Sequence, residues 1–455
     1  MLLAREKGRK KGKAMNIQLS EHFGYKKLLR FTLPSIATML FSGIYGSADG
    51  IFISNFAGEL PFVSVNLIYP VLFLLSSFGF MFGSGGSALV AKTMGEGDRD
   101  KANRIFSLLV YVSILFSAVL AVVGILLLPH VAKILSENPQ VQSLCVTYGT
   151  IILCALPASV LQFEFNYFFI TAERPYLGLF FAMAAGLTNI LLDALFVAVF
   201  RLGVVGAAIA TVCGQVVGGV LPLFYFLRKT SVLCLTKTGM DEKSLFKTCA
   251  NGSSEFMTNV SYSVVTILYN AQLQTLAGET GVNSYAAISC VAFIFLAIFL
   301  GYSSGVAPVV SFHFGANHTD ELHGLYKRSL WITGGTSVFL YLFSLALAHP
   351  LSAVFAAGNQ AMHEMTVHGF LLYAVSFLLA GFNIFASAFF TALNDGGVSA
   401  IIAFSRMLFF QVLFVLVLPV FWGLNGVWLS VVFAEASSLA LSLFFLLFKQ
   451  KKYRY

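Results

Sequence analysis

Four polar side chains in the first half of the chain lie within or at the end of long apolar stretches. Asp49 lies in SADGIFIS, Asn189 and Asp193 lie in TNILLDALF, and Thr211 ends GVVGAAIAT. An aspartate at the centre of a membrane helix costs about 2.5–3.5 kcal/mol on insertion scales, so such residues are kept where they face a cavity, a partner or an ion. Asn189 and Asp193 are four residues apart and therefore project from one face of a helix.

These four side chains offer two carboxylates, an amide oxygen and a hydroxyl, which are ligands that a dehydrated Na⁺ accepts. The same acids would also hold a proton, because burial and like charges disfavour the ionised form of a carboxyl group. Each acid could instead simply hydrogen-bond a neighbouring helix. We predict a site for a small cation, and the residues leave open whether that cation is H⁺ or Na⁺.

A second set of residues combines acids with aromatic rings. Glu164 lies in LQFEFNYFF near one end of its apolar stretch, and Glu255 lies in NGSSEFMTN. Aromatic faces beside carboxylates suit lipophilic organic cations, through apolar contact and cation–π attraction. The residues that we predict to line a substrate cavity are Gln162, Glu164, Tyr167, Glu255 and Tyr269.

The composition places these residues in a membrane. Of 455 residues, 58% are hydrophobic and only 11% are charged, whereas soluble domains have about 25% charged residues. Apolar stretches of about 20 residues, each long enough to cross a bilayer core of about 30 Å, recur throughout. We predict twelve all-helical spans, near 31–54, 62–90, 105–128, 146–170, 177–199, 206–227, 251–276, 284–312, 327–348, 367–390, 398–420 and 427–447.

The chain repeats itself at a constant offset of 220 residues. The tripeptide AGE at 57–59 returns at 277–279, and Gly203 and Gly206 return as Gly423 and Gly426. Six spans per half is an even number, so the two lobes are parallel repeats related by a pseudo-two-fold axis along the membrane normal. The acids are not repeated: Asp49, Asn189 and Asp193 correspond to Tyr269, Phe409 and Leu413.

Three further positions have structural interpretations. Pro34 is either an ordinary helix-start residue or a bend that only the first half possesses, because its repeat partner is a serine. Glu435 corresponds to Gln215, and this shared polarity favours a role in packing. Arg406 lies near the inner end of its span, where we expect it to snorkel to the interface.

The distribution of charge predicts topology. Of the 28 Lys and Arg residues, nine lie between Arg5 and Arg30 and four between Lys449 and Arg454. Only Lys133 and Arg201 fall in the predicted outer loops. This is the positive-inside pattern, with both termini in the cytoplasm, and it explains the net charge of +8 without a nucleic-acid partner. No signal-peptide pattern precedes the first span, and Met15 is an alternative start.

The predicted organisation has five parts. They are a basic cytoplasmic N-terminus (1–30), an N-lobe (31–227), a cytoplasmic linker (228–248), a C-lobe (249–448) and a basic tail (449–455).

The chain resembles the multidrug and toxic compound extrusion (MATE) transporters of bacterial type. The resemblance extends from about residue 31 to residue 448, and its most specific pieces are SADGIFIS, TNILLDALFV, and the TAERP and WGLNGVW turns. It implies a multi-pass protein of the bacterial cytoplasmic membrane that exports organic cations in exchange for H⁺ or Na⁺. Its two lobes would rock to expose a central cleft to each side in turn.

The resemblance also assigns residues. An Asp of the first helix, an Asn and an Asp of the fifth and a Thr of the sixth form the N-lobe cation site, and they correspond to Asp49, Asn189, Asp193 and Thr211, the Na⁺ ligands if Na⁺ is the coupling ion. The first-helix proline implicated in bending corresponds to Pro34. Glu255 matches a seventh-helix acid, but span eight has no clear acid, so this chain departs from branches with a complete C-lobe site.

Two alternatives belong to other functional classes. A flippase for lipid-linked saccharides would share the two-lobe plan, but it would need basic residues in its cleft for an anionic cargo. A membrane enzyme would need a nucleophile, metal or cofactor constellation, and the sequence contains no such pattern. We therefore expect no enzymatic activity, no cofactor beyond the coupling ion, and a monomer whose partners are its substrates and the lipid bilayer.

Overall fold

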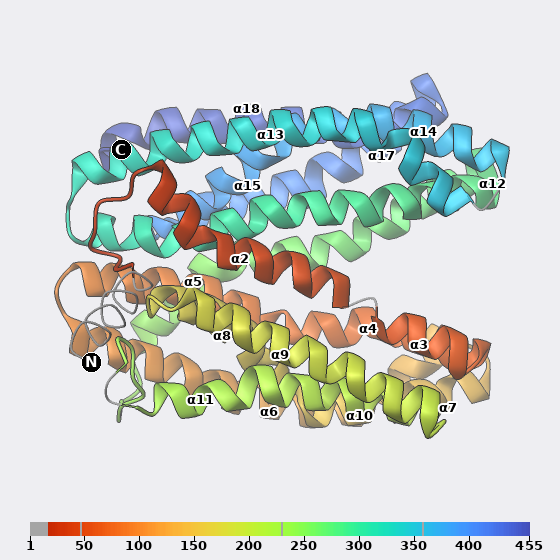
Figure 1. The fold of residues 1–455 in the computed structure, drawn as a ribbon, viewed down its shortest axis with the longest axis horizontal. Helices are drawn as coiled ribbons and strands as arrows, with labels where there is room; N and C mark the ends of the chain where they lie inside the picture. The colour runs from red at the N-terminus through yellow and green to blue at the C-terminus, as the bar shows by residue number, and fades with distance from the viewer. Residues whose placement is uncertain (1–16, 46–47, 229–230, 357–358) are drawn as a thin grey trace, which may run out of the picture.

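The computed structural model is built of helices and describes residues 17–45, 48–228, 231–356 and 359–455. Part of the predicted basic N-terminus, including Met15, and residues 229–230 of the predicted linker lie outside the described residues. Figure 1 shows two layers of helices, one formed by most of the first half of the chain and the other by most of the second half. The first described residues and the C-terminus lie at one end of the bundle, which we call the terminal end.

The helices of the first half are α2 (Tyr25–Tyr45), α3 (Ala48–Phe56), α4 (Glu59–Ser76), α5 (Phe78–Gly95), α6 (Arg99–Leu135), α7 (Pro139–Cys154), α8 (Leu156–Thr171), α9 (Pro175–Asp193), η1 (Ala194–Val199), α10 (Gly203–Gln215), η2 (Val216–Val220) and α11 (Leu221–Phe226). Those of the second half are α12 (Glu242–Gly315), α13 (Thr319–Ala356), α14 (Gln360–Ala374), α15 (Phe377–Ala392), α16 (Gly396–Phe404), η3 (Ser405–Phe409), α17 (Phe410–Trp422) and α18 (Leu424–Tyr453). The η elements are π-helices.

The predicted all-helical, two-lobe membrane architecture is confirmed. Eight helices among the described residues are long and apolar enough to cross a membrane, or ten if α7–α8 and α14–α15, bent by 57° and 48°, each form one span. Helix α12 has 74 residues and contains a non-helical residue, Gly278, which divides it into two spans. The first predicted span corresponds to α2 and α3, with residues 46–47 outside the described part.

The internal repeat is preserved in the backbone. Gly58 and its repeat partner Gly278 both have positive φ angles, of 99° and 60°. Gly203 and its partner Gly423 also do, at 58° and 54°. Because an L-residue with a side chain rarely adopts such angles, these glycines allow the same tight turn in both halves.

The two lobes meet through reciprocal glycine contacts near the terminal end. A Cβ atom added to Gly95 would lie 2.0 Å from the carbonyl oxygen of Phe312, and one added to Gly315 would lie 2.1 Å from that of Lys92. Lys92 and Phe312 are themselves repeat partners, so the pseudo-two-fold axis relates the two contacts. Only residues without a Cβ allow α5 and α12 to approach this closely.

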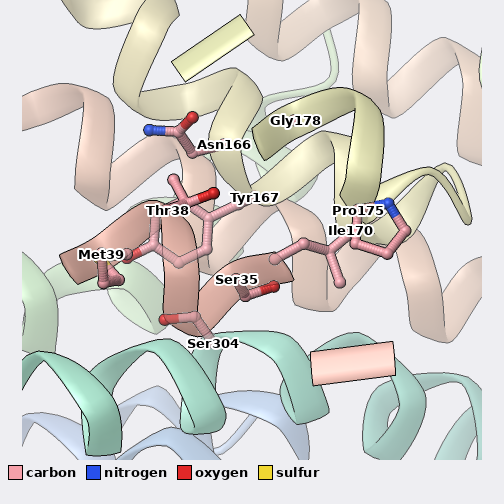
Figure 2. A pocket seen from close by; sticks show the side chains of 9 residues that line it. All are labelled: Ser35, Thr38, Met39, Asn166, Tyr167, Ile170, Pro175, Gly178 and Ser304. Carbon is pink, nitrogen blue, oxygen red and sulfur yellow. The ribbon is translucent and has the colours of Figure 1, made fainter. Parts of the chain in front are cut away.

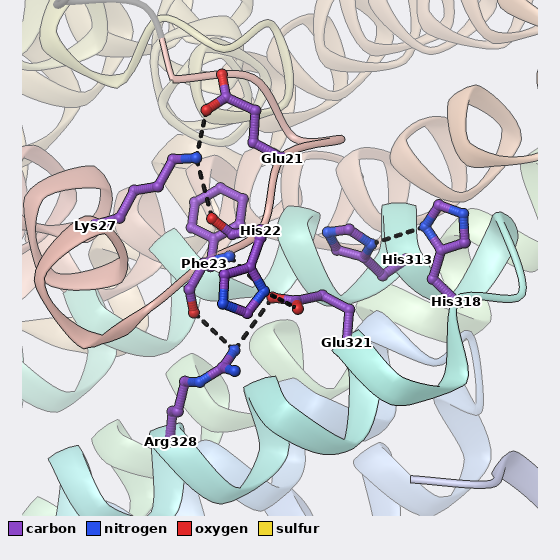
Figure 3. A network of polar contacts seen from close by, with 8 residues as sticks. All are labelled: Glu21, His22, Phe23, Lys27, His313, His318, Glu321 and Arg328. Carbon is purple, nitrogen blue, oxygen red and sulfur yellow. Dashed lines mark hydrogen bonds and ion pairs between the residues drawn. The ribbon is translucent and has the colours of Figure 1, made fainter.

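The segment that precedes α2 contacts both lobes at the same end, and Figure 3 shows its contacts with α13. The Leu19 amide donates to Oε1 of Glu173, in the turn after α8, over 2.8 Å. The Phe23 amide donates to Oε1 of Glu321, in the first turn of α13, over 2.9 Å, and Arg328 donates to the Phe23 carbonyl over 2.7 Å. Leu19 and Phe23 are fully buried, so this segment holds both lobes together at the terminal end.

The C-lobe contains a buried ion pair. Nε of Arg406 lies 2.9 and 3.0 Å from the two carboxylate oxygens of Glu435, and Nδ2 of Asn383 donates to the same carboxylate over 2.7 Å. Arg406 is only 7% exposed, so the prediction that it snorkels to the interface is wrong. The reason is that Glu435 on α18 supplies a counter-charge inside the lobe, which the sequence of the Arg406 span does not reveal.

We expect the Arg406→Met variant to be destabilised by about 3–5 kcal/mol, because it leaves the Glu435 carboxylate buried and unpaired. The double variant Arg406→Met/Glu435→Met removes both charges and should recover most of this loss. Thermal unfolding of the purified proteins measures both effects, with Arg201→Met, at an exposed position, as the control. Equal melting temperatures for the single and double variants would contradict this account of the ion pair.

Candidate functional site

The four residues of the predicted cation site come from three helices and lie together in the N-lobe. Nδ2 of Asn189 donates to Oδ1 of Asp49 over 2.8 Å and to Oδ2 of Asp193 over 3.2 Å. The Thr211 hydroxyl lies 2.6 Å from Oδ2 of Asp49. The site therefore joins α3, the end of α9 and the middle of α10.

Local helix geometry explains how these side chains converge. Asp193 is the last residue of α9, and the π-helix η1 begins directly after it. π-Helical turns are rare in proteins as a whole, and many of those that occur lie at functional sites. A Cβ atom added to Gly214 of α10 would lie 2.9 Å from the Ala185 carbonyl oxygen and 3.2 Å from Cβ of Asn189. The glycine thus lets α10 pack closely against the helix that carries Asn189 and Asp193.

The hydrogen bonds of the site do not neutralise its charge. The two amide protons of Asn189 serve both carboxyl groups, and the Thr211 proton is shared between Asp49 and the Ala207 carbonyl. Oδ1 of Asp193 has no hydrogen-bond partner in the described part of the chain, although Asp193 is fully buried. All of these donors are neutral. A fully buried carboxyl group beside a half-buried one, with only neutral donors, favours a positive charge, which a proton or a metal cation can supply.

Tyr148 is a site residue that the sequence analysis missed. It lies on α7, is 2% exposed, and has the Thr211 hydroxyl as a hydrogen-bonding neighbour and both aspartates as electrostatic neighbours. Its repeat partner is His368, so a mismatch between the halves marks this position, but nothing along the chain indicates that α7 faces α10.

Pro34 lies inside α2 and is not at its start, because α2 begins at Tyr25. The alternative of an ordinary helix-start proline is therefore excluded. The Thr38 hydroxyl donates to the Pro34 carbonyl over 2.9 Å. A proline in a helix interior removes one backbone hydrogen bond and favours a bend, so Pro34 is a weak point of α2.

A small pocket lies at the junction of the two halves, among α2, α8, α9 and α12 (Figure 2). Its lining residues are Ser35, Thr38, Met39, Asn166, Tyr167, Ile170, Pro175, Gly178 and Ser304. Of the predicted cavity residues, Tyr167 lines this pocket, and Glu255 is an electrostatic neighbour of Tyr167. Glu255 is partly exposed and also interacts electrostatically with Arg406. An acid and an aromatic ring thus meet where the lobes join.

The other three predicted cavity residues lie inside their own lobes. Gln162 packs against Gly218 of η2, and Glu164 is fully buried beside Gly83 of α5. Tyr269 is 2% exposed and donates to Oε1 of Gln411 over 2.9 Å. In this conformation neither Glu164 nor Tyr269 faces a water-filled space, because neighbouring helices pack directly against them.

The described residues contain no group of three or more His, Cys, Asp or Glu side chains that could hold a metal ion. The ligand set of the N-lobe site, with two carboxyl groups, an amide and a hydroxyl, instead suits a hard monovalent cation or a proton.

Comparison with known proteins agrees with the repeat and the fold. The sequence model of the MatE family matches residues 34–195 and 255–417, one match in each half. The chain is 27% identical to the multidrug export protein MepA of Staphylococcus haemolyticus, over 92% of each chain. It is 24% identical to MepA of Staphylococcus aureus strain MRSA252, over 90% of this chain and 91% of that protein.

Solved structures show the same fold at low sequence identity. A MATE protein in complex with MaL6 superposes with a TM-score of 0.91 at 20% identity, over 96% of this chain and 98% of that chain. An outward-facing conformation of a multidrug resistance MATE family transporter has a TM-score of 0.87 at 21% identity, with the same coverage.

We expect the purified protein to melt at a higher temperature when Na⁺ is added or when the pH is lowered, because a cation bound at Asp49 and Asp193 stabilises the folded state. The gain is about 2.7 kcal/mol at a cation concentration of 100 times Kd. Asp193→Asn should lose most of this response, whereas Glu59→Gln, at an exposed acid near Asp49, should keep it. An identical response in wild type and Asp193→Asn would rule out this site as the cation-binding site.

Proposed function

Because this chain belongs to the MatE family, we propose that it is a multidrug efflux transporter and that it has no enzymatic activity. It exports lipophilic, mostly cationic organic compounds in exchange for H⁺ or Na⁺. The name of the MepA relatives, multidrug export proteins that match about nine-tenths of this chain, supports the cargo class. The observation that supports coupling to a cation is the pair of carboxyl groups on either side of Asn189. The hydrogen-bond donors that contact these carboxyl groups are all neutral.

Coupling follows if the cation and the drug stabilise different conformations. A cation between Asp49 and Asp193 removes their repulsion and draws α3 toward α9, whereas the ionised pair resists that approach. Pro34 gives α2, the helix preceding α3, a place to bend. Occupancy of the N-lobe site thereby changes the shape of the first span, which also contacts the C-lobe through Thr32 and Gly305.

We place the terminal end in the cytoplasm, because basic residues are concentrated there under the positive-inside rule. The glycine contacts between α5 and α12 then close the cytoplasmic side, and this conformation is the one that opens outward. We propose a bacterial cytoplasmic membrane location, a monomer, an N-lobe of residues 31–227, a C-lobe of residues 249–448, and cytoplasmic segments at 1–30, 228–248 and 449–455.

The drug site lies at the junction of the lobes in this proposal. Glu255 supplies a negative charge and Tyr167 an aromatic face, a combination that favours organic cations. A lipid-linked saccharide flippase would need free basic groups at this junction. Arg406, the buried basic residue nearest to Glu255, is already neutralised by Glu435. Export of cations is therefore the better supported function.

We expect Asp49→Asn and Asp193→Asn each to abolish ethidium efflux from cells, because an amide cannot carry the exchangeable charge. Immunoblots of membranes should show normal amounts of both variants, and Glu59→Gln should transport at the wild-type rate. Wild-type efflux in both variants would refute the coupling site. In proteoliposomes, pH and Na⁺ gradients imposed separately identify the driving ion, and transport without either gradient would refute antiport.

We expect Glu255→Gln to weaken the transport of cationic drugs more than that of neutral ones, because the variant loses charge and keeps shape. The loss of one charge-assisted contact, about 1.5–3 kcal/mol, corresponds to roughly a 10- to 150-fold higher half-saturating concentration for the cation. Transport assays with ethidium and an uncharged dye of similar size measure this difference. An equal effect on both dyes would place Glu255 outside the drug site.

A further inference from the structure

Glu164 is a buried acid that the proposed transport cycle does not use. It lies in the middle of α8, its exposed fraction is 0%, and neither of its carboxyl oxygens has a hydrogen-bond partner in the parts of the chain that the structure describes. An ionised carboxylate without a partner is very costly in a medium that excludes water. A proton on the group removes most of this cost.

The surroundings of Glu164 are polar but uncharged. Ser113 of α6 is the polar neighbour that influences the carboxyl group, although neither side chain makes a well-formed hydrogen bond among the described residues. From α5 comes Gly83, where an added Cβ atom would lie 3.0 Å from Cα of Glu164. A protonated carboxyl group and a serine hydroxyl can each donate one hydrogen bond and accept another. A small rotation of the two side chains would therefore form a hydrogen bond between neutral Glu164 and Ser113.

The titratable side chains of the neighbouring helices are engaged elsewhere. Lys92 of α5 pairs with Glu96, and Tyr111 of α6 donates to the Thr236 carbonyl. Asp193 of α9 accepts from Asn189, Glu255 of α12 faces Tyr167 and Arg406, and Tyr148 of α7 faces Thr211.

The basic residues of α6 lie near its two ends: Arg99, Lys101, Arg104, His130 and Lys133. Arg104 precedes Ser113 by nine residues, which is about 13 Å along a helix. No fixed cation among the described residues therefore acts on Glu164, and the charge that neutralises it is exchangeable.

A route to the lobe junction passes Tyr167, one helical turn further along α8. The Tyr167 ring lies against Gly83, with Cδ2 2.7 Å from the position of an added Cβ atom, and Tyr167 also lines the small pocket with Ser304 of α12 (Figure 2). When the lobes part, α12 leaves this ring, and rotation of Tyr167 opens the Glu164 site to water.

We propose that Glu164 is a second proton-binding site, separate from the Asp49–Asp193 pair, which is loaded in the conformation seen here and releases its proton when the lobes part. Its part in transport rests on the antiport proposed above. The ligand is a proton and not Na⁺, because one carboxyl and one hydroxyl offer too few oxygens to replace the hydration shell of a metal ion. Gly83 of α5 thereby gains a function, because its lack of a side chain lets α5 pack directly over Glu164.

The site can be tested by infrared difference spectroscopy on the purified full-length protein. We expect a carbonyl-stretch band of a protonated carboxylic acid at neutral pH, present in wild type and in Asp49→Asn/Asp193→Asn, and lost when Glu164→Gln is added to that double variant. Glu59→Gln, which changes an exposed acid, is the matched control. A band that persists unchanged when Glu164→Gln is added to Asp49→Asn/Asp193→Asn overturns the proposal.

Proton release on drug binding tests the function of the site. Tetraphenylphosphonium added to weakly buffered protein should release fewer protons per bound cation from Glu164→Gln than from wild type, and Glu164→Asp should restore part of the release. Equal release from wild type and Glu164→Gln would make Glu164 a merely structural acid and overturn the proposal. Failure of the proposed antiport would instead appear as wild-type efflux in the Asp49 and Asp193 variants, whatever the behaviour of Glu164.

Discussion

The structure depends on one electrostatic constraint, which is that the N-lobe holds two carboxyl groups around a single amide without a basic residue to balance them. Asp49 and Asp193 both accept from Asn189, and Asp193 is fully buried. In a medium of low dielectric, such a pair is stable only when a cation or a proton joins it. In the proposed mechanism, the shape of this lobe is tied to the occupancy of its site.

The C-lobe meets the same problem with a permanent cation. The Arg406 guanidinium occupies the interior of that lobe and pairs with Glu435, which Asn383 also contacts. The repeat partners of Arg406 and Glu435 are Gly186 and Gln215, so the N-lobe has no equivalent ion pair. The two copies of the fold therefore balance their buried acids differently. The C-lobe has a fixed positive charge, and the N-lobe, in the proposed mechanism, has an exchangeable one.

The contacts between the lobes are fitted to a joint that opens and closes. Around Gly95 and Gly315 the backbones touch directly, and the pseudo-two-fold axis relates the two contacts. At the same end, the segment around Leu19 and Phe23 adds polar contacts to both lobes. A joint of small residues and half-buried hydrogen bonds costs less to separate than an interdigitated apolar core.

The sequence alone determined the membrane-spanning helices and the duplication, and it predicted the four residues of the candidate N-lobe site. Hydropathy and repeat spacing are properties of the linear sequence. A polar residue in an apolar span can likewise be recognised without knowing which helices pack against it. The shared contacts of Asp49, Asn189 and Thr211 agree with that prediction. The assignment of each loop and of the two termini to the inner or outer membrane face rests on charge alone and stays a prediction.

Only the tertiary structure decided which helices face one another. It placed Tyr148 beside Thr211, paired Arg406 with Glu435, and enclosed Glu164 between α5 and α6. Each of these relations joins residues that are distant in sequence, so hydropathy, spacing and repeats carry no signal for them. The direction in which a membrane helix turns its polar side chains is set by packing against its neighbours, and that packing exists only in the folded bundle.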